Sequence, residues 1–345
     1  MVSVTWEECG CILKQLQAAA HVVRSNLGEP SRTESKRVLK TLLPKILSCL
    51  QVFRQTINVV FLQNDDETSN QDTLIQEQLE RSAGLLAATQ MCTRCKIPTI
   101  GSIQQEREEK TQDELAAVSQ VNKVLSRHNQ PGISAADQER LKALVIRRRQ
   151  QEQQLAFHRG LFKAQQEFSG DGSNYSAENF SYGSTPFSTW LNLFTQKSVL
   201  DAVSRSRKQT LTVFGSSSGS LVLFAALTLG LRSVGVEILP FLHDVAERTR
   251  QELQIPKDKC CFVCADMLTV SLQETSILLL TSQCWDAGLY QQIQQQLEGE
   301  LQSGALVLDY KAALQNSPHF QLLQELPNQR VSWNSAQSLF IFIRT

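Results

Sequence analysis

The chain has 345 residues, 34 basic and 34 acidic side chains, and no formal net charge at pH 7. A neutral chain does not gather nucleic acid or anionic membrane by bulk charge attraction, so we expect no strong direct nucleic-acid binding. The nine cysteines show no disulfide framework, which favours a reducing compartment. Without a signal-peptide pattern or an apolar run of membrane-spanning length, we expect an intracellular protein, nuclear or cytoplasmic, with no membrane segment.

Residues 1–168 are predicted to be helical, because they are rich in Gln, Glu, Arg, Leu and Ala and contain few glycines. Capping boxes at Thr5 and Ser31 begin two helices, and a third is predicted over about 72–90. Apolar residues at helical spacing resume after the charged stretch 104–114, which is either a solvated helix end or disordered.

The segment 134–168 is predicted to be one long helix, with the basic run "IRRRQQEQQ" (146–154) in its middle. We interpret this run as a solvated face rather than a nuclear signal or a phosphate-binding patch. The N-terminal half is therefore predicted to be a helical bundle with a coiled-coil-like arm, and we expect its helices to bind a protein partner.

The pattern changes after "SGDGSNYSAEN" (169–179), which is predicted to be a linker. From residue 180 to 345, short apolar strands alternate with helical segments, as is typical of a parallel sheet covered by helices. Only "NSAQS" (334–338) separates the last two strands, so we expect an antiparallel pair at the sheet edge. The predicted strands are Leu211–Phe214, Ser233–Glu237, Cys260–Val263, Ile277–Leu280, Ala305–Asp309, Gln329–Trp333 and Leu339–Ile343, and the predicted helices cover about 220–231, 239–254, 286–302 and 317–326.

Candidate ligand-binding residues follow the first three of these strands, at the sheet edge where open α/β sheets bind ligands. Gly215 and Gly219 bracket the turn "GSSSG", where glycine permits close approach of a ligand and the next helix offers free amides. Glu237 follows the second strand, where a carboxylate can accept both hydroxyls of a ribose. Asp266 follows the third strand beside Met267, and this pair suits the amino edge and the face of an adenine.

Four short motifs in this half, "YGST" (182–185), "VGVE" (234–237), "CADML" (264–268) and "VSW" (331–333), resemble histone lysine methyltransferases of the disruptor-of-telomeric-silencing type. The resemblance covers roughly residues 180–345, and in it the chain is most similar to the short, divergent protist members of that family. It implies a seven-stranded, Rossmann-like class I methyltransferase domain that uses S-adenosylmethionine. A protein lysine, of histone type, is the acceptor that it implies.

The same resemblance implies roles for individual residues. Tyr182 and Thr185 match the loop that folds over the cofactor, and Gly215, Ser216 and Gly219 match the glycine motif after the first strand. Glu237 matches the ribose-binding acid, and Asp266 the adenine-side acid, with Met267 in place of an aromatic residue. Thr281 stands where the family has a catalytic-site Asn, and Trp333 matches a wall of the lysine channel, for which Trp285 is a second candidate.

Three departures from the family pattern leave a second function open. Ser184 and Val213 replace acids, and Ser217 replaces the middle glycine. A hydrogen bond to a charged group contributes roughly 1.5–3 kcal/mol, so the loss of the acid at Val213 weakens the methionine half of the site. The alternative is a catalytically inactive methyltransferase-fold subunit that acts as a scaffold in a larger assembly.

A hydrolase and a metal-binding site are two further possibilities that the sequence raises. The stretch "GSSSG" also fits a hydrolase turn with Ser217 in its centre, for which Asp309 and His319 are candidate partners. Two cysteine pairs, at 92 and 95 and at 261 and 264, have zinc-like spacing. The second pair lies on a predicted strand, where residues three apart face opposite sides. The first pair lies in a plausible loop but has no obvious second pair to complete a site, so we expect no metal site.

Overall fold

The computed structural model describes residues 100–169, 175–204 and 210–345. The helices that the sequence predicts before residue 100 lie outside these residues. Residues 109–150 and 163–345 form one compact unit, and the described residues 100–108 and 151–162 belong to another. The predicted division at 169–179 stays a prediction, but residues 109–150, which precede it, pack with the sheet.

A seven-stranded sheet forms the centre of the larger unit, in the order β3-β2-β1-β4-β5-β7-β6. The first five strands in the chain pair in parallel, and β7 runs antiparallel to both β5 and β6. This order and these directions are those of the class I methyltransferase sheet, so the predicted Rossmann-like domain is confirmed. The strands are β1 (Thr210–Phe214), β2 (Arg232–Glu237), β3 (Cys260–Cys264), β4 (Ile277–Leu280), β5 (Leu306–Asp309), β6 (Phe320–Val331) and β7 (Asn334–Arg344).

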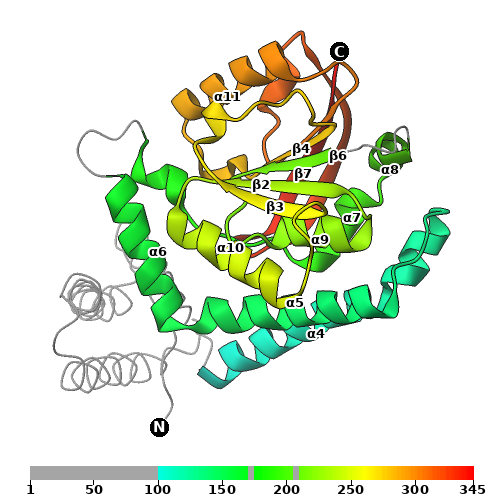
Figure 1. The fold of residues 1–345 in the computed structure, drawn as a ribbon, viewed down its shortest axis with the longest axis vertical. Helices are drawn as coiled ribbons and strands as arrows, with labels where there is room; N and C mark the ends of the chain where they lie inside the picture. Colours follow the sequence, from blue (N-terminus) through cyan, green and yellow to red (C-terminus); the bar gives the residue numbers. More distant parts are fainter. Residues whose placement is uncertain (1–99, 170–174, 205–209) are drawn as a thin grey trace, which may run out of the picture. The chain divides into compact units, whose positions relative to one another are not determined.

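Helices connect the parallel strands and precede the sheet. Figure 1 shows α11 on one side of the sheet and α5, α9 and α10 on the other. The α-helices are α4 (Ile100–Arg127), α5 (Ala135–Gln153), α6 (Leu155–Phe168), α7 (Phe187–Phe194), α8 (Lys197–Ser204), α9 (Ser220–Thr228), α10 (Pro240–Glu252) and α11 (Ala287–Glu300). Short 3-10 turns are η1 (Ala177–Phe180), η2 (Met267–Thr269), η3 (Ser282–Cys284) and η4 (Ala313–Asn316).

Alternate residues of the central strands β1, β4 and β5 pack into two separate hydrophobic cores, because successive side chains of a strand point to opposite faces. Ile277 and Leu279 of β4 join one core with α4, α5, α7 and α9. Leu278 and Leu280 join the other core, with α11. The α4–α5 pair thus shares its core with the sheet. Among the described residues, no helix combines the length and the apolar character that a bilayer crossing requires.

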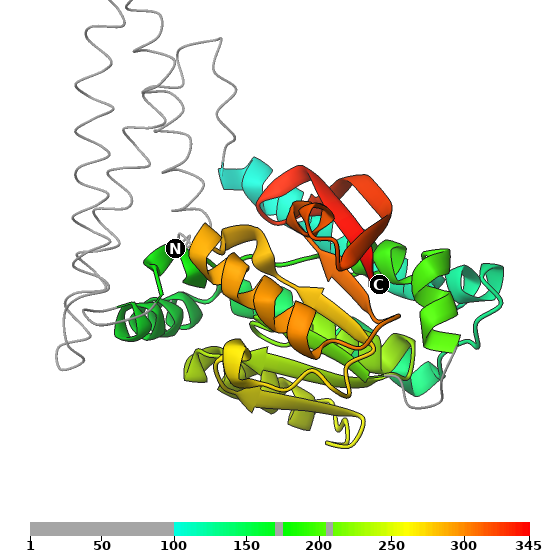
Figure 2. The same ribbon diagram turned by 90° about the horizontal axis from the view of Figure 1, so that it is seen from above.

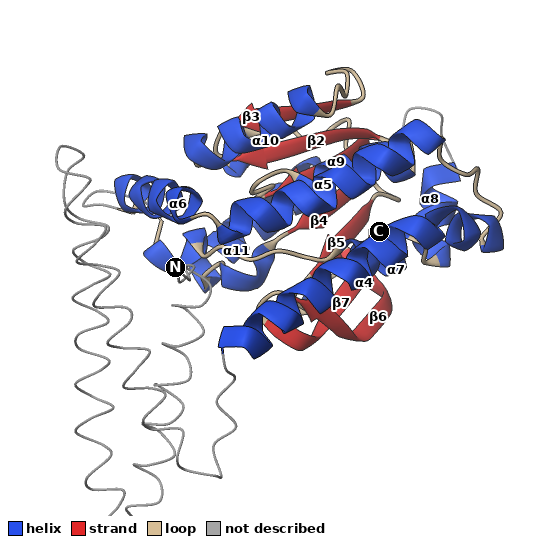
Figure 3. Cartoon of the chain, turned by 90° about the horizontal axis from the view of Figure 1, so that it is seen from below, coloured by secondary structure: helices blue, strands red, loops and turns tan. Residues whose placement is uncertain are grey.

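The C-terminal hairpin corrects two predictions. The predicted helix over 317–326 is wrong, because residues 320–331 form the long strand β6. The predicted turn at 334–338 is also wrong, because Val331 pairs with Asn334 and the turn is made by Ser332 and Trp333. Irregular register at Leu322/Gln324 and Leu326/Gln329 breaks the two-residue alternation that marks a strand in sequence. Figures 2 and 3 show this hairpin at the opposite end of the sheet from β3.

The N-terminal helices follow the sequence expectation in part. The charged stretch 104–114 is helical and belongs to α4. The single helix predicted over 134–168 is instead two, α5 and α6, separated at Gln154. The interpretation of the basic run as a solvated face holds only in part, since Gln150 and the apolar Ile146 are exposed but Arg148 is only 2 % exposed.

Candidate functional site

A cavity of about 220 Å³ lies at the carboxyl ends of β1, β2, β3 and β4. One buried water needs only about 10–15 Å³, so this space is of ligand size rather than a hydration site. The segment Tyr182–Pro186, called the covering segment below, contributes Tyr182 through Thr185 to its lining. All the sequence candidates except Gly219 line it, namely Tyr182, Thr185, Gly215, Ser217, Glu237, Asp266, Met267, Thr281, Trp285 and Trp333.

The turn between β1 and α9 needs its two glycines for different reasons. Gly215 has φ +69° and Gly219 φ +84°, in the left-handed region that glycine tolerates. A Cβ on Gly215 would meet the Thr281 hydroxyl, whereas one on Gly219 would lie 2.6 Å from the Phe262 ring. Gly219 caps α9 and lets it pack closely on the sheet, so its contribution to the cavity is indirect.

Ser217, at the apex of this turn, also has a positive φ, +53°. A residue with a Cβ is strained there by roughly 1–2 kcal/mol. Its backbone N–H donates to Glu237 Oε2 at 2.8 Å, and that charged hydrogen bond fixes the turn against the end of β2.

Glu237 is the central acid of the site. It is 6 % exposed, and its two oxygens accept hydrogen bonds from the Ser217 N–H and from the Leu239 N–H at 3.0 Å. Burial raises the pKa of Glu237, while these backbone hydrogen bonds act in the opposite direction. Each carboxylate oxygen can accept a second hydrogen bond, so the group suits a pair of ligand hydroxyls.

Asp266 lies in the same cavity as Glu237, as the sequence predicts. Its Oδ1 accepts from the Leu268 N–H at 2.9 Å, and its Oδ2 accepts from the Tyr175 hydroxyl at 2.5 Å. Tyr175, which sequence reasoning missed, lines the cavity as well. Burial and the hydrogen bond to Asp266 raise the pKa of Tyr175, so the phenol stays protonated and orients the carboxylate.

The loop after β4 holds Thr281 in a structural arrangement. The Thr281 hydroxyl donates to the carbonyl oxygens of Phe214 and Gly215, at 2.9 and 3.0 Å. Its single hydrogen is thus shared between backbone acceptors, and the hydroxyl can serve a substrate only as an acceptor. Thr281 therefore braces the β1 turn, which is a different task from the catalytic one that the resemblance implies.

Asp309, at the end of β5, supports that loop from within the core. Its carboxylate accepts from the hydroxyls of Ser282 and Tyr290, the latter at 2.5 Å. Burial raises the pKa of Asp309 to about 6, and the hydrogen bonds oppose this shift. Trp285, at the end of the same loop, is buried, and its carbonyl oxygen accepts from Lys311 Nζ at 2.7 Å.

The covering segment is tied to the turn of the β6–β7 hairpin. Ser184 N–H donates to Ser332 Oγ at 2.8 Å, and Ser332 N–H donates to the Ser184 carbonyl at 2.9 Å. Trp333 packs on the Tyr310 ring with centroids 5.6 Å apart, and its ring leaves no room for a Cβ on Gly183. Thr185 and Tyr310 share a hydroxyl hydrogen bond of 2.5 Å.

Some polar side-chain atoms in the cavity lining lack partners within the described chain. Ser216 Oγ, Ser217 Oγ and Trp333 Nε1 are buried and make no hydrogen bond there. A buried polar group without a partner costs roughly 1–3 kcal/mol, and a polar ligand supplies the missing partners. Together with the acceptors Glu237 and Asp266, these atoms fit a nucleoside-type ligand that carries hydroxyl and amino groups.

The hydrolase alternative finds no general base here. Histidine is absent from the described residues that line the cavity, and Asp309 is bound to Ser282 and Tyr290. For metals, the described residues contain no group of three His, Cys, Asp or Glu placed as ligands. The first cysteine pair, at 92 and 95, lies outside those residues.

Comparisons with known proteins find likeness only at the level of structure. No family model and no curated protein matches the sequence. An RNA methyltransferase from Salinibacter ruber, solved with S-adenosyl-L-homocysteine, is 20 % identical, with 43 % of this chain and 92 % of that chain covered and a TM-score of 0.34. Magnesium protoporphyrin IX methyltransferase from Synechocystis PCC 6803, with bound SAM, is 12 % identical, with 53 % and 91 % covered and a TM-score of 0.37.

A third structure is geranyl diphosphate C-methyltransferase from Streptomyces coelicolor A3(2), solved with S-adenosyl-L-homocysteine. It is 11 % identical, with 42 % of this chain and 73 % of that chain covered and a TM-score of 0.35. At these identities and TM-scores the likeness does not identify a substrate. The fold is instead defined by the order and the directions of the strands.

Proposed function

We propose that this chain binds S-adenosylmethionine and transfers its methyl group, with a lysine of a protein, of histone type, as the acceptor. The observation that carries the proposal is the convergence of Glu237 and Asp266 on one cavity, beside the β1–α9 turn. Glu237 would hold the ribose hydroxyls, and Asp266, oriented by Tyr175, would accept from the adenine amino group.

When bound, S-adenosylmethionine supplies a sulfonium methyl group, whose carbon is taken by the amine as the sulfur–carbon bond breaks and the amine loses a proton. The chain has to align the amine and exclude water, because this reaction depends on geometry more than on a strong base. The aromatic rings of Tyr182, Tyr310 and Trp333 line the cavity and support that role. The choice of lysine rests on the family resemblance of residues 180–345.

A second candidate is a subunit that binds the cofactor without transferring its methyl group. Val213 stands where the family has an acid, and it is fully buried in the core that contains α4, α5 and α9, outside the cavity lining. The methionine half of the ligand therefore lacks that carboxylate, which favours weaker or unproductive binding.

Titration calorimetry with S-adenosylhomocysteine tests the binding site. We expect micromolar affinity for the unaltered protein, and a tenfold to hundredfold loss in Glu237→Gln, because the neutral amide loses a charged hydrogen-bond acceptor. Glu274→Gln is the matched control, since Glu274 pairs with Arg232 at the opposite end of β2. Equal affinities for both variants and the unaltered protein would refute the site.

Transfer is then measured with radiolabelled S-adenosylmethionine and a panel of histone octamers, nucleosomes and tRNA. Label on lysine supports the lysine proposal, and label on RNA alone contradicts it. Tight binding of the cofactor with no labelled acceptor favours the second candidate.

A further inference from the structure

A buried carboxylate outside the cavity holds the end of the covering segment. Glu114 of α4 is 1 % exposed, and it accepts from Arg148 Nη2 at 2.5 Å and from Arg149 Nη2 at 2.6 Å. The same carboxylate accepts from the backbone N–H of Phe187 at 2.8 Å. Phe187 directly follows the covering segment, so an acid from α4 fixes the backbone at that point.

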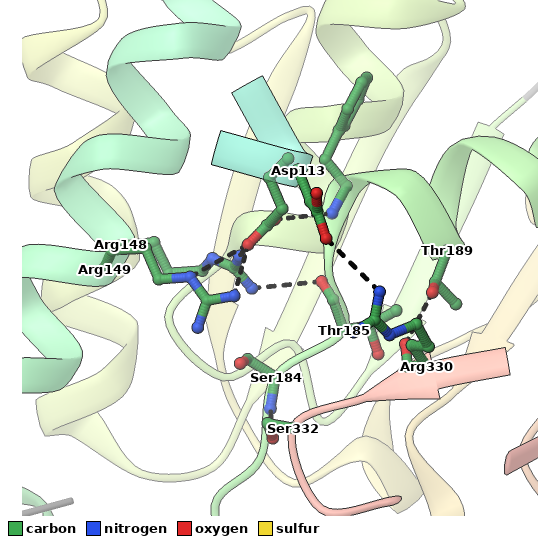
Figure 4. A network of polar contacts seen from close by, with 10 residues as sticks. Asp113, Arg148, Arg149, Ser184, Thr185, Thr189, Arg330 and Ser332 are labelled. Carbon is green, nitrogen blue, oxygen red and sulfur yellow. Dashed lines mark hydrogen bonds and ion pairs between the residues drawn. The ribbon is translucent and has the colours of Figure 1, made fainter. Parts of the chain in front are cut away.

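Arg148 extends this contact into the segment itself. Its Nη1 donates to the Thr185 carbonyl oxygen at 3.2 Å, and the side chain lines the cavity. Figure 4 shows Arg148 and Arg149 reaching together from α5 toward the backbone that carries Ser184 and Thr185. The Thr185 carbonyl and the Phe187 amide are thus both held by one ion-paired group.

The neighbouring residue of α4, Asp113, contacts β6 rather than the covering segment. Asp113 forms an ion pair with Arg330 of β6 at 3.4 Å, and the Arg330 carbonyl accepts from Thr189 Oγ1 at 2.6 Å. The hairpin turn that follows β6 makes the paired hydrogen bonds between Ser332 and Ser184. Asp113 therefore contacts the strand that leads into this hairpin turn, through an exposed ion pair (Figure 4).

The buried ion pair of Glu114 and Arg148 is not explained by its effect on stability. Burial of an ion pair in a protein interior adds little stability compared with apolar packing, because desolvation offsets the attraction. Glu114 is not part of the cavity lining, so direct contact with a ligand does not account for it. Its hydrogen bonds fix atoms of a segment that does line the cavity, which gives a reason for an acid at this position.

We propose that Glu114 is a positioning residue, which holds the covering segment against the cavity through Arg148 and the Phe187 amide. The α4–α5 pair is then a working part of the binding site, although the family resemblance begins only near residue 180. The effect on ligand affinity rests on the function proposed above, whereas the effect on the order of the segment does not.

Glu114→Gln tests the proposal in the full chain, with two separate measurements. Hydrogen exchange by mass spectrometry, without ligand, is expected to show at least tenfold faster exchange in peptides that span 182–190, with β1 and β4 unchanged. Calorimetry with S-adenosylhomocysteine is expected to show at least tenfold weaker binding. Local loss of protection with an intact sheet separates positioning from a general loss of stability.

Arg147→Gln is the matched control. Arg147 lies on the same helix and next to Arg148, but it pairs with Glu252 and donates to Thr249 Oγ1 on α10. We expect this variant to keep the exchange of 182–190 and the affinity of the unaltered protein. If Glu114→Gln does not fold, Arg148→Lys replaces it, since lysine keeps the charge but loses the forked contact to Glu114 and Thr185.

The outcomes separate the two proposals. Unchanged exchange in 182–190 overturns the positioning role, whatever the affinity. Faster exchange with unchanged affinity overturns it as well, because the segment would then not serve the cavity. If the unaltered protein binds no S-adenosylhomocysteine, the proposed function fails, and the exchange measurement still decides whether Glu114 orders the segment.

Discussion

Ser217 is the residue of the β1–α9 turn that departs from the pattern implied by the family resemblance. It occupies a left-handed conformation, which favours glycine, and its N–H donates to Glu237. The backbone contact therefore survives the substitution, because it needs no particular side chain. What changes is the local strain and the added hydroxyl, whose oxygen is buried in the cavity lining.

Replacement of Ser217 by glycine is expected to stabilise the protein by up to about 1.5 kcal/mol. Relief of the left-handed strain, roughly 1–2 kcal/mol, outweighs the extra unfolded-state entropy of glycine, roughly 0.5–1 kcal/mol. Urea unfolding measures the difference. Ser218→Gly is the control, since Ser218 has no positive φ and should only lose stability. Equal losses in both variants would contradict the strain argument.

The burial of Arg148 could not be predicted from the local sequence pattern. Arg148 sits in a basic run that is typical of a solvated helix face, yet it is buried against Glu114. The two residues are 34 positions apart. No local pattern connects them, because the partner is brought in by the packing of α4 on α5.

At the scale of elements, the helices that flank the site are fixed by their termini. Asp286 caps α11 by accepting from the Leu289 N–H at 2.9 Å. Its other oxygen accepts from Asn179 Nδ2 at 2.7 Å and from Ser176 Oγ at 3.0 Å. The Asp286 carboxylate thus caps the N-terminus of α11 and connects this helix to the turn η1. The turn η1 leads into the covering segment.

Asp286→Ala is expected to lower the free energy of unfolding by about 1–2 kcal/mol, because the cap and the contacts to η1 are lost together. Asp286→Asn keeps an acceptor for the Leu289 N–H and should lose less. Guanidinium unfolding followed by circular dichroism gives both values. If the two variants lose the same stability, the cap is not the stabilising contact.

At the scale of the whole compact unit, helices from both halves of the chain and the sheet are one structure. Val121 of α4 and Leu144 of α5 are buried in the same core as Leu211 of β1. The family resemblance covers only residues from about 180, but residues 109–150 complete the core on one face of the sheet. Removal of those helices would expose that face.

The stability of this unit should depend on pH through Asp309. Burial raises its pKa to about 6, above the value of about 4 in an unfolded chain. The contribution of Asp309 to the free energy of unfolding is therefore fully present below pH 4 and is lost as the pH rises through 6. The loss is about 3 kcal/mol, because the two pKa values differ by about two units and each unit corresponds to about 1.4 kcal/mol.

Asp309→Asn removes that titration, so the mutational loss of stability is expected to be larger at pH 4 than at pH 7.5. Urea unfolding of both proteins at the two pH values measures it. The difference in the free energy of unfolding between the two proteins cancels the contributions of the other titrating groups. A difference that does not change with pH would show that Asp309 keeps an ordinary pKa.

The sequence by itself determined the strand-and-helix alternation from β1 to β5, because apolar runs of four to six residues and their spacing are local properties. It also determined that Glu237 and Asp266 line one cavity, since parallel strands bring their carboxyl ends to one edge of a sheet. Only the tertiary structure decided the register of the β6–β7 hairpin, where bulges hide the strand pattern. It alone decided the partners Tyr175, Tyr310 and Glu114 as well, because each joins segments that are distant in sequence and is selected by packing rather than by spacing.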